Sequence, residues 1–106
     1  MKDIKNLTLN YVTAFNNKSI KDILSLVDEN IFLKDPANEI SNKTDLSSFL
    51  KTFFENSISF SAKQIICEEN TSVIHFDLRV NEATLSGVDI IEWESGRIKS
   101  IIAYLS

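Results

Sequence analysis

Apolar and polar residues alternate in residues 74–80, and this pattern constrains the fold more than any other feature of the chain. It is typical of a β-strand with one buried face. Looser alternation in residues 59–69, 83–93 and 97–105 predicts three more strands, and a Ser-Gly pair at 95–96 predicts the turn between the last two. The residues predicted to face inward in the clearest strand are Ile74, Phe76, Leu78 and Val80.

The first half of the chain has a helical period instead. Apolar residues recur every three or four positions in residues 3–17 and again in residues 20–27, where Ser19 is a good N-cap. A short strand is predicted at residues 31–35, and a third helix beginning near residue 44 or 45. Helices followed by antiparallel strands favour one α+β domain spanning residues 1–106, with the helices packed on one face of a curved sheet.

Composition excludes several classes of protein. A net charge of −4 leaves little basic surface for a nucleic acid or an anionic membrane. One cysteine, Cys67, and one histidine, His75, cannot build a disulfide framework or a usual zinc site, and two glycines leave no Gly-rich phosphate loop. We therefore expect no metal and no other cofactor. The apolar runs are short and no secretory signal follows Met1, so we expect no membrane span and a cytoplasmic location.

Asp89 is a carboxyl on the predicted inner face of its strand, in phase with Leu85, Ile91 and Trp93. A buried and unpaired ionised aspartate costs several kcal/mol, so such a residue is paired, protonated or at the edge of a cavity. The alternative is a twist or bulge near Gly87 that turns Asp89 toward solvent.

Two more polar residues fall in phase with apolar neighbours. Asp35 follows Ile31 and Leu33, and the alternative for it is a plain Asp-Pro turn that ends the strand. Tyr11 lies on the apolar side of the first helix, where the alternative is a core tyrosine with a satisfied hydroxyl. If the phenol and the two carboxyls meet in one apolar cavity, they form a general base and two hydrogen-bond donors.

At these positions the sequence resembles the ketosteroid isomerase family, within the larger NTF2-like (SnoaL-like) superfamily. The first part of the resemblance runs from Tyr11-Val12-Thr13-Ala14-Phe15 to Ile31-Phe32-Leu33-Lys34-Asp35-Pro36. The second part comprises Gly87-Val88-Asp89-Ile90-Ile91, Gly96-Arg97-Ile98 and Ala103-Tyr104-Leu105. Val27 and Leu50 stand where some isomerases have further tyrosines, and Leu105 stands where a tryptophan is common.

The resemblance implies a cone-shaped α+β barrel in which three N-terminal helices pack on a curved antiparallel or mixed sheet. It implies that Asp35 is the general base, and that Tyr11 and a protonated Asp89 are the donors to the oxyanion. No nucleophile, metal or cofactor takes part. The residues that it implies around the substrate are Phe15, Ile74, Phe76, Leu85, Gly87, Ala103 and Leu105.

The function predicted in this way is the shift of a double bond by proton abstraction next to a carbonyl in an apolar small molecule. Two alternatives stay open, namely a different lyase, cyclase or hydrolase on the same fold, and a binding protein without turnover. The expected partners are an apolar ligand and a second copy of the chain. Pairing of two sheets is suggested by apolar residues such as Val88 and Ile90 on the outer face.

Overall fold

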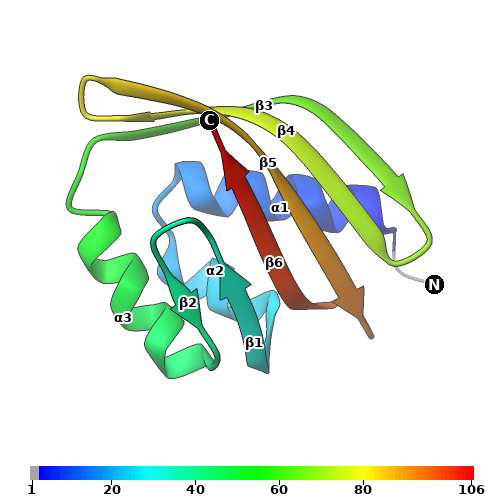
Figure 1. Cartoon of the computed structure of the whole chain (residues 1–106). Coiled ribbons are helices and arrows are strands. Elements are labelled where there is room, and N and C mark those ends of the chain that lie inside the picture. Colours follow the sequence, from blue (N-terminus) through cyan, green and yellow to red (C-terminus); the bar gives the residue numbers. More distant parts are fainter. Residues whose placement is uncertain (1–2) are drawn as a thin grey trace.

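Three helices cover one side of a curved sheet in the computed structural model, which describes residues 3–106 (Figure 1). The helices are α1 (Ile4–Asn16), α2 (Ile20–Ser25) and α3 (Lys43–Phe53). The strands are β1 (Val27–Lys34), β2 (Glu39–Ile40), β3 (Ile58–Glu68), β4 (Thr71–Val80), β5 (Ala83–Glu94) and β6 (Arg97–Leu105). The α+β class predicted from the sequence is therefore confirmed.

Each helix begins at a side chain that accepts hydrogen bonds from its first turn. Asp3 accepts from the backbone N–H of Lys5, Ser19 caps α2, and Asn42 caps α3. The third helix thus begins one residue before the earliest predicted start, because the side chain of Asn42 rather than that of Thr44 binds the free N–H groups.

The sheet has the strand order β2-β1-β6-β5-β4-β3. Strands β3 to β6 form the predicted antiparallel meander, whereas β1 is parallel to β6. Strand β1 begins at Val27, which the periodicity assigned to the second helix, because α2 ends at Ser25 and Val27 pairs with Ile98. The two-residue strand β2 is too short to give a periodic signal.

The sheet is open, and the helices complete the expected cone-shaped barrel instead of a ring of strands. Strands β2 and β3 are its two edges and do not pair with each other. Register shifts at Ala62/Gln64 in β3 and at Glu92/Trp93 in β5 bend the sheet. Helix α1 packs against β3 and β4, while α3 packs against β1 and α2, so the helices fill the hollow side that the strands leave open (Figure 1).

Helix α1 is attached to the sheet at two places along its length. Near its start, the hydroxyl oxygens of Thr8 and Ser72 lie 2.6 Å apart, and the indole of Trp93 donates to Ser72 at 2.6 Å. At its end, the amide of Asn16 donates to the carbonyl of Phe60 and accepts from the N–H of the same residue, both at 2.8 Å. These bonds satisfy buried polar groups and fix the helix relative to β3, β4 and β5.

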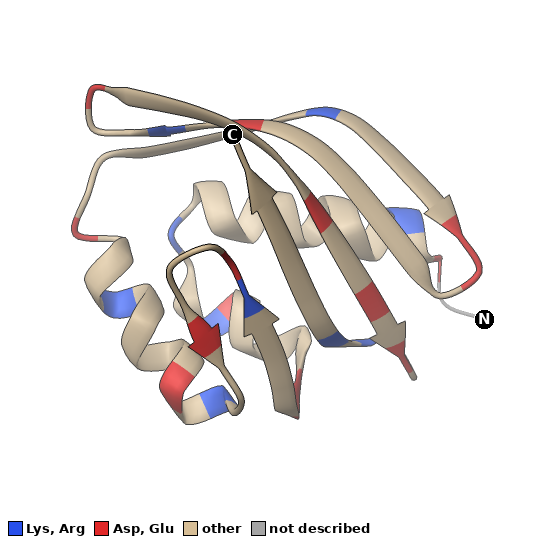
Figure 2. Ribbon diagram, viewed as in Figure 1, with Lys and Arg blue, Asp and Glu red and all other residues tan. Residues whose placement is uncertain are grey.

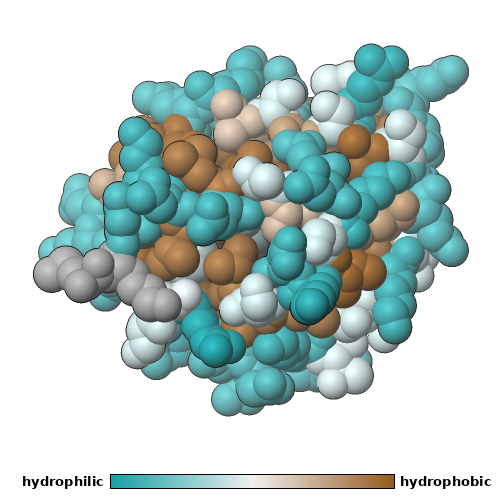
Figure 3. Space-filling model, turned by 180° about the vertical axis from the view of Figure 1, so that it is seen from behind, coloured by the Kyte–Doolittle hydropathy of each residue, from teal (hydrophilic) through white to brown (hydrophobic). Residues whose placement is uncertain are grey.

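Charged residues are spread over helices, turns and strand ends, and β6 carries none after Lys99 (Figure 2). Seen from behind, where α1 lies, the surface is hydrophilic with separate apolar areas between the polar side chains (Figure 3). No helix among residues 3–106 is long and apolar enough to cross a membrane.

Candidate active site

A cavity of about 270 Å³ lies between the hollow face of the sheet, α1, α3 and the loop after β1. Its wall is mainly aliphatic and aromatic, and its polar side chains are few, as is typical of small-molecule sites. The residues that line it are Tyr11, Phe15, Leu33, Asp35, Pro36, Ala37, Asn38, Phe49, Phe53, Phe60, Phe76, Leu78, Val80, Leu85, Asp89, Ile101, Ala103 and Leu105.

Tyr11 and Asp89 line this cavity, and each side chain is almost completely buried, with 6% of the residue exposed. Tyr11 lies on the buried face of α1 together with Thr8, Ala14 and Phe15. The β4–β5 register is regular from Thr71/Glu92 to Val80/Ala83, so no bulge turns Asp89 outward. The alternative of a solvent-facing Asp89 is therefore wrong, and the alternation along the strand places its carboxyl inward.

Neither side chain is hydrogen bonded within the part of the chain that the structure describes. No fully enclosed side-chain nitrogen or oxygen in that part lacks a hydrogen-bond partner. The unpaired oxygen atoms of Tyr11 and Asp89 are therefore not fully enclosed, and both residues line the cavity. Two polar groups in an apolar wall, both free to bind, are the groups that fix a ligand's orientation.

Burial controls the ionisation of these two groups. Burial, and to a lesser extent the negative charge of Asp35, raises the pKa of Asp89 to about 7. Burial and the neighbouring Asp89 charge raise the pKa of Tyr11 well above its ordinary value. The phenol is thus a hydrogen-bond donor throughout the physiological range, and Asp89 becomes a donor in its protonated form.

Asp35 lies at the end of β1, in the turn that leads to β2. Its backbone N–H donates to the carbonyl of Asn38 at 3.0 Å, which closes a turn with proline in its second position. The Oδ1 atom of its carboxylate accepts from the backbone N–H groups of Ala37 and Asn38 at 2.8 and 2.7 Å. The residue is half-buried and lines the cavity, so it both follows the end of the strand and borders the cavity.

The structure places eight of the ten residues singled out from the sequence around this cavity. Besides the phenol and the two carboxyls, these are Phe15, Phe76, Leu85, Ala103 and Leu105.

Two of the ten, Ile74 and Gly87, do not line the cavity. Ile74 pairs with Asp89 but is fully buried in the core. Gly87 has no side chain to form a wall, and a Cβ atom there would meet the carbonyl oxygen of Tyr104 at 2.4 Å. Gly87 permits the close approach of β5 and β6, so it shapes the cavity indirectly.

Asn38 is the polar lining residue that sequence reasoning missed. Its side-chain N–H group donates to both oxygens of Asp35, at 3.0 and 3.1 Å. The signal available was an asparagine three residues after Asp35, across an Asp-Pro turn. Phe49, Phe53 and Phe60 also line the cavity, although their spacing did not distinguish pocket wall from core.

The chemistry of this set is proton transfer and hydrogen bonding. An oriented carboxylate can remove a proton, and a phenol and a neutral carboxyl can stabilise the oxygen on which charge develops. Among residues 3–106, no three His, Cys, Asp or Glu side chains gather as metal ligands would. His75 and Cys67 are exposed on the sheet and lie outside the cavity lining.

The family model of the SnoaL-like domain matches residues 9–101 of this chain. No curated protein matches it. An NTF2-like protein of unknown function from Cytophaga hutchinsonii has a TM-score of 0.89 and 16% identity, with 100% of this chain and 92% of that chain covered.

Two further solved structures carry a stated activity. A proposed ketosteroid isomerase from Kribbella flavida has a TM-score of 0.90 and 14% identity, with 97% of this chain and 77% of that chain covered. A LEH-like epoxide hydrolase from M. tuberculosis has a TM-score of 0.81 and 10% identity, with 95% and 80% covered. At such identities the likeness shows the NTF2-like fold, and this fold hosts more than one activity.

Proposed function

The chain belongs to the SnoaL-like domain family, and from this premise we propose that it is an isomerase that moves a carbon–carbon double bond in an apolar ketone. One observation carries the proposal: the hydroxyl of Tyr11 and the carboxyl of Asp89 face an apolar cavity without a partner in the described chain, and Asp35 lines the same cavity. A base and two donors around apolar space match the demands of enolisation.

In the proposed reaction, the ketone oxygen binds between Tyr11 and protonated Asp89. The carboxylate of Asp35 removes a proton from the carbon next to the carbonyl, and the electrons of that C–H bond form a dienolate. The two donors stabilise the negative charge on its oxygen. Asp35 then returns the proton to the far end of the conjugated system, so the product is an isomer of the substrate and no co-reactant is consumed.

The test is turnover of a β,γ-unsaturated ketosteroid, followed by the absorbance of the conjugated enone. We expect conversion by the wild-type chain and a loss of roughly 10²- to 10⁴-fold in kcat for Asp35→Asn, since that variant lacks the base. Glu39→Gln is the matched control, because Glu39 is an exposed carboxyl in the neighbouring strand β2. Its rate should equal that of the wild type.

The other outcomes identify the two alternative functions. Tight binding of substituted phenols with no conversion of any enone would indicate a binding protein that keeps the cavity without turnover. Conversion of an epoxide to a diol, dependent on Asp35, would indicate a hydrolase, which is the activity stated for the M. tuberculosis neighbour. Either outcome refutes the isomerase proposal.

The proposal includes a cytoplasmic homodimer that forms through the outer face of the sheet. Ile66, Val73, Ile90 and Ile102 are consecutive cross-strand neighbours on β3, β4, β5 and β6. We call these four residues the outer row. Ile66 is 53% exposed and the other three residues are half-buried, and the apolar surface that this row leaves to solvent gains stability when a second sheet covers it. A free exposed thiol, Cys67, suits a reducing compartment.

A further inference from the structure

The four polar residues around the cavity differ in how firmly they are held. Tyr11 and Asp89 make no side-chain hydrogen bond within the described chain, so the backbone of α1 and β5 and the packing of buried neighbours set their positions. The carboxylate of Asp35, in contrast, accepts four hydrogen bonds from the turn that contains it. Asn38 supplies three of the four, two of them from its side chain.

These bonds are divided unequally between the two carboxylate oxygens. Oδ1 accepts from the backbone N–H groups of Ala37 and Asn38 and from the Asn38 amide. Oδ2 accepts only from the Asn38 amide, at 3.1 Å. A carboxylate has about four lone-pair sites, so Oδ2 keeps capacity for one more proton or donor, while Oδ1 is fully occupied.

We infer that Asn38 is a positioning residue, which fixes the plane of the Asp35 carboxylate and presents Oδ2 to the ligand. The backbone N–H groups of Ala37 and Asn38 bind only Oδ1, so they oppose rotation about the Cβ–Cγ bond from that oxygen alone. The side-chain amide of Asn38 contacts both oxygens and so prevents this rotation. This inference rests on the proposed function, in which Asp35 is the base, and it deepens that function by naming the atom that takes the proton.

The turn sequence makes this contact possible. Asp35 and Asn38 occupy the first and last positions of the turn, and the bond from Asp35 N–H to the Asn38 carbonyl brings the two residues side by side. Pro36 and Ala37, between them, are exposed and donate nothing from their side chains. Asn38 is itself part of the cavity wall, so the positioning contact lies at the edge of the ligand site.

The experiment compares Asn38→Ala, which removes the side-chain donor, with Asn38→Ser, which retains a shorter one. Asn10→Ala is the control, because Asn10 is exposed on α1 and does not line this cavity. We expect Asn38→Ala to lower kcat about tenfold with KM within twofold of the wild type, because an unaligned base slows proton transfer and leaves binding intact. Asn38→Ser should recover part of the loss, and Asn10→Ala should have wild-type kinetics.

Crystal structures of the wild type and of Asn38→Ala provide a readout that does not need activity. We expect one carboxylate orientation at Asp35 in the wild type, and a rotated or divided carboxylate in Asn38→Ala. A carboxylate with the same single orientation in both crystals refutes the positioning role, and so does an unchanged kcat in Asn38→Ala. If the wild type converts no enone, the isomerase proposal fails, and the two crystal structures still decide the role of Asn38.

Discussion

Asp89 keeps its proton at a pH where an exposed aspartate has lost it. Its pKa is raised to about 7 because its carboxyl is buried among apolar residues and faces the charge of Asp35. A folded chain with such a group binds more protons than the unfolded chain between about pH 4 and pH 7. The group therefore contributes stability that is present at low pH and lost as the pH rises through this window.

We predict that Asp89→Asn removes this pH dependence. As the pH rises from 4.5 to 8, the wild type should lose free energy of unfolding relative to Asp89→Asn, by at most about 4 kcal/mol. Urea unfolding, followed by the fluorescence of the buried Trp93, measures it. The comparison between variants cancels the opposite effect of Asp77, whose pKa is lowered mainly by the hydroxyl of Ser86. A constant difference across the pH range would contradict the prediction.

The sequence predicted the polar residues of the site better than their partners. Tyr11, Asp35 and Asp89 were identified because each interrupts an apolar pattern, and burial of a polar group is costly enough to mark such positions. The contact between Asn38 and Asp35 could not be predicted in this way. It depends on the three-dimensional shape of one turn, and an asparagine in a turn is too common to signal a contact.

At the scale of the elements, the end of the β5–β6 pair depends on Gly87. A Cβ atom at this position would lie 2.4 Å from the carbonyl oxygen of Tyr104 and 2.8 Å from the Cδ2 atom of Leu105. The first neighbour is backbone and cannot rotate away. Any side chain at position 87 therefore pushes the end of β6, and with it the cavity residue Leu105, away from β5.

We predict that Gly87→Ala destabilises the chain by about 1–3 kcal/mol, because the clash can be relieved only by a backbone shift. Its affinity for an apolar phenol should fall as well, since Leu105 moves out of the cavity wall. Thr84→Ala is the control, because Thr84 is exposed on the same strand. Urea unfolding and equilibrium dialysis are the measurements, and a variant as stable as the control would refute the role assigned to Gly87.

The local sequence predicted the ends of helices and strands where N-caps and alternation were clear. It did not predict them where pairing between strands sets the boundary. The meander was predicted because its strands carry alternating residues and its final turn has a Ser-Gly pair. The early start of β1 was not, because Val27 continues a helical spacing and becomes a strand residue only by pairing with Ile98. The parallel pairing of β1 with β6 joins segments far apart in the chain, and local patterns carry no information about it.

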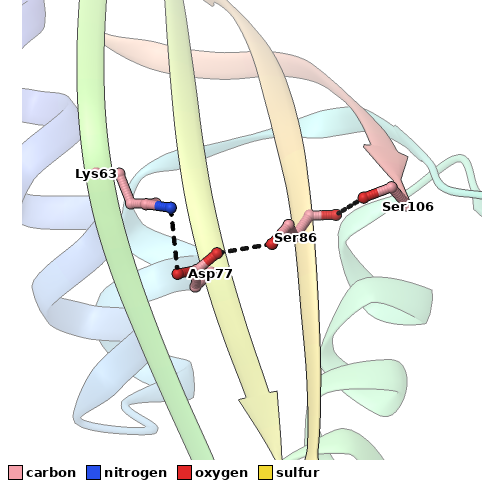
Figure 4. A network of polar contacts seen from close by, with 4 residues as sticks. All are labelled: Lys63, Asp77, Ser86 and Ser106. Carbon is pink, nitrogen blue, oxygen red and sulfur yellow. Dashed lines mark hydrogen bonds and ion pairs between the residues drawn. The ribbon is translucent and has the colours of Figure 1, made fainter.

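At the scale of the whole molecule, the outer face of the sheet has two different ends. The outer row is apolar, whereas nearer the β4–β5 turn Lys63, Asp77, Ser86 and Ser106 form a polar network across the strands (Figure 4). Lys63 Nζ lies 3.5 Å from Asp77 Oδ2, and the Ser86 hydroxyl donates to Asp77 Oδ1 at 2.7 Å. Because these polar groups are satisfied within one chain, the outer row is the part of this face that gains from a partner.

We predict that Ile90→Lys converts the proposed dimer to a monomer, because two lysines would be buried without partners at the centre of the interface. Thr84→Lys is the matched control: it adds the same charge to the same face of β5, outside the outer row. Sedimentation at micromolar concentration should give a dimer for the control and a monomer for Ile90→Lys. A monomeric wild-type chain would refute the dimer.

The two attachments of α1 have a consequence for the energetics of ligand capture. Tyr11 lies between Thr8, which is bonded to Ser72, and Asn16, which is bonded to the backbone of Phe60. The helix is thus fixed on both sides of Tyr11. Its ring is almost completely buried and packs beside Phe15, so it has little rotational freedom left to lose. Binding of the proposed ligand then requires almost no further ordering of this side chain, so more of the interaction energy appears as affinity.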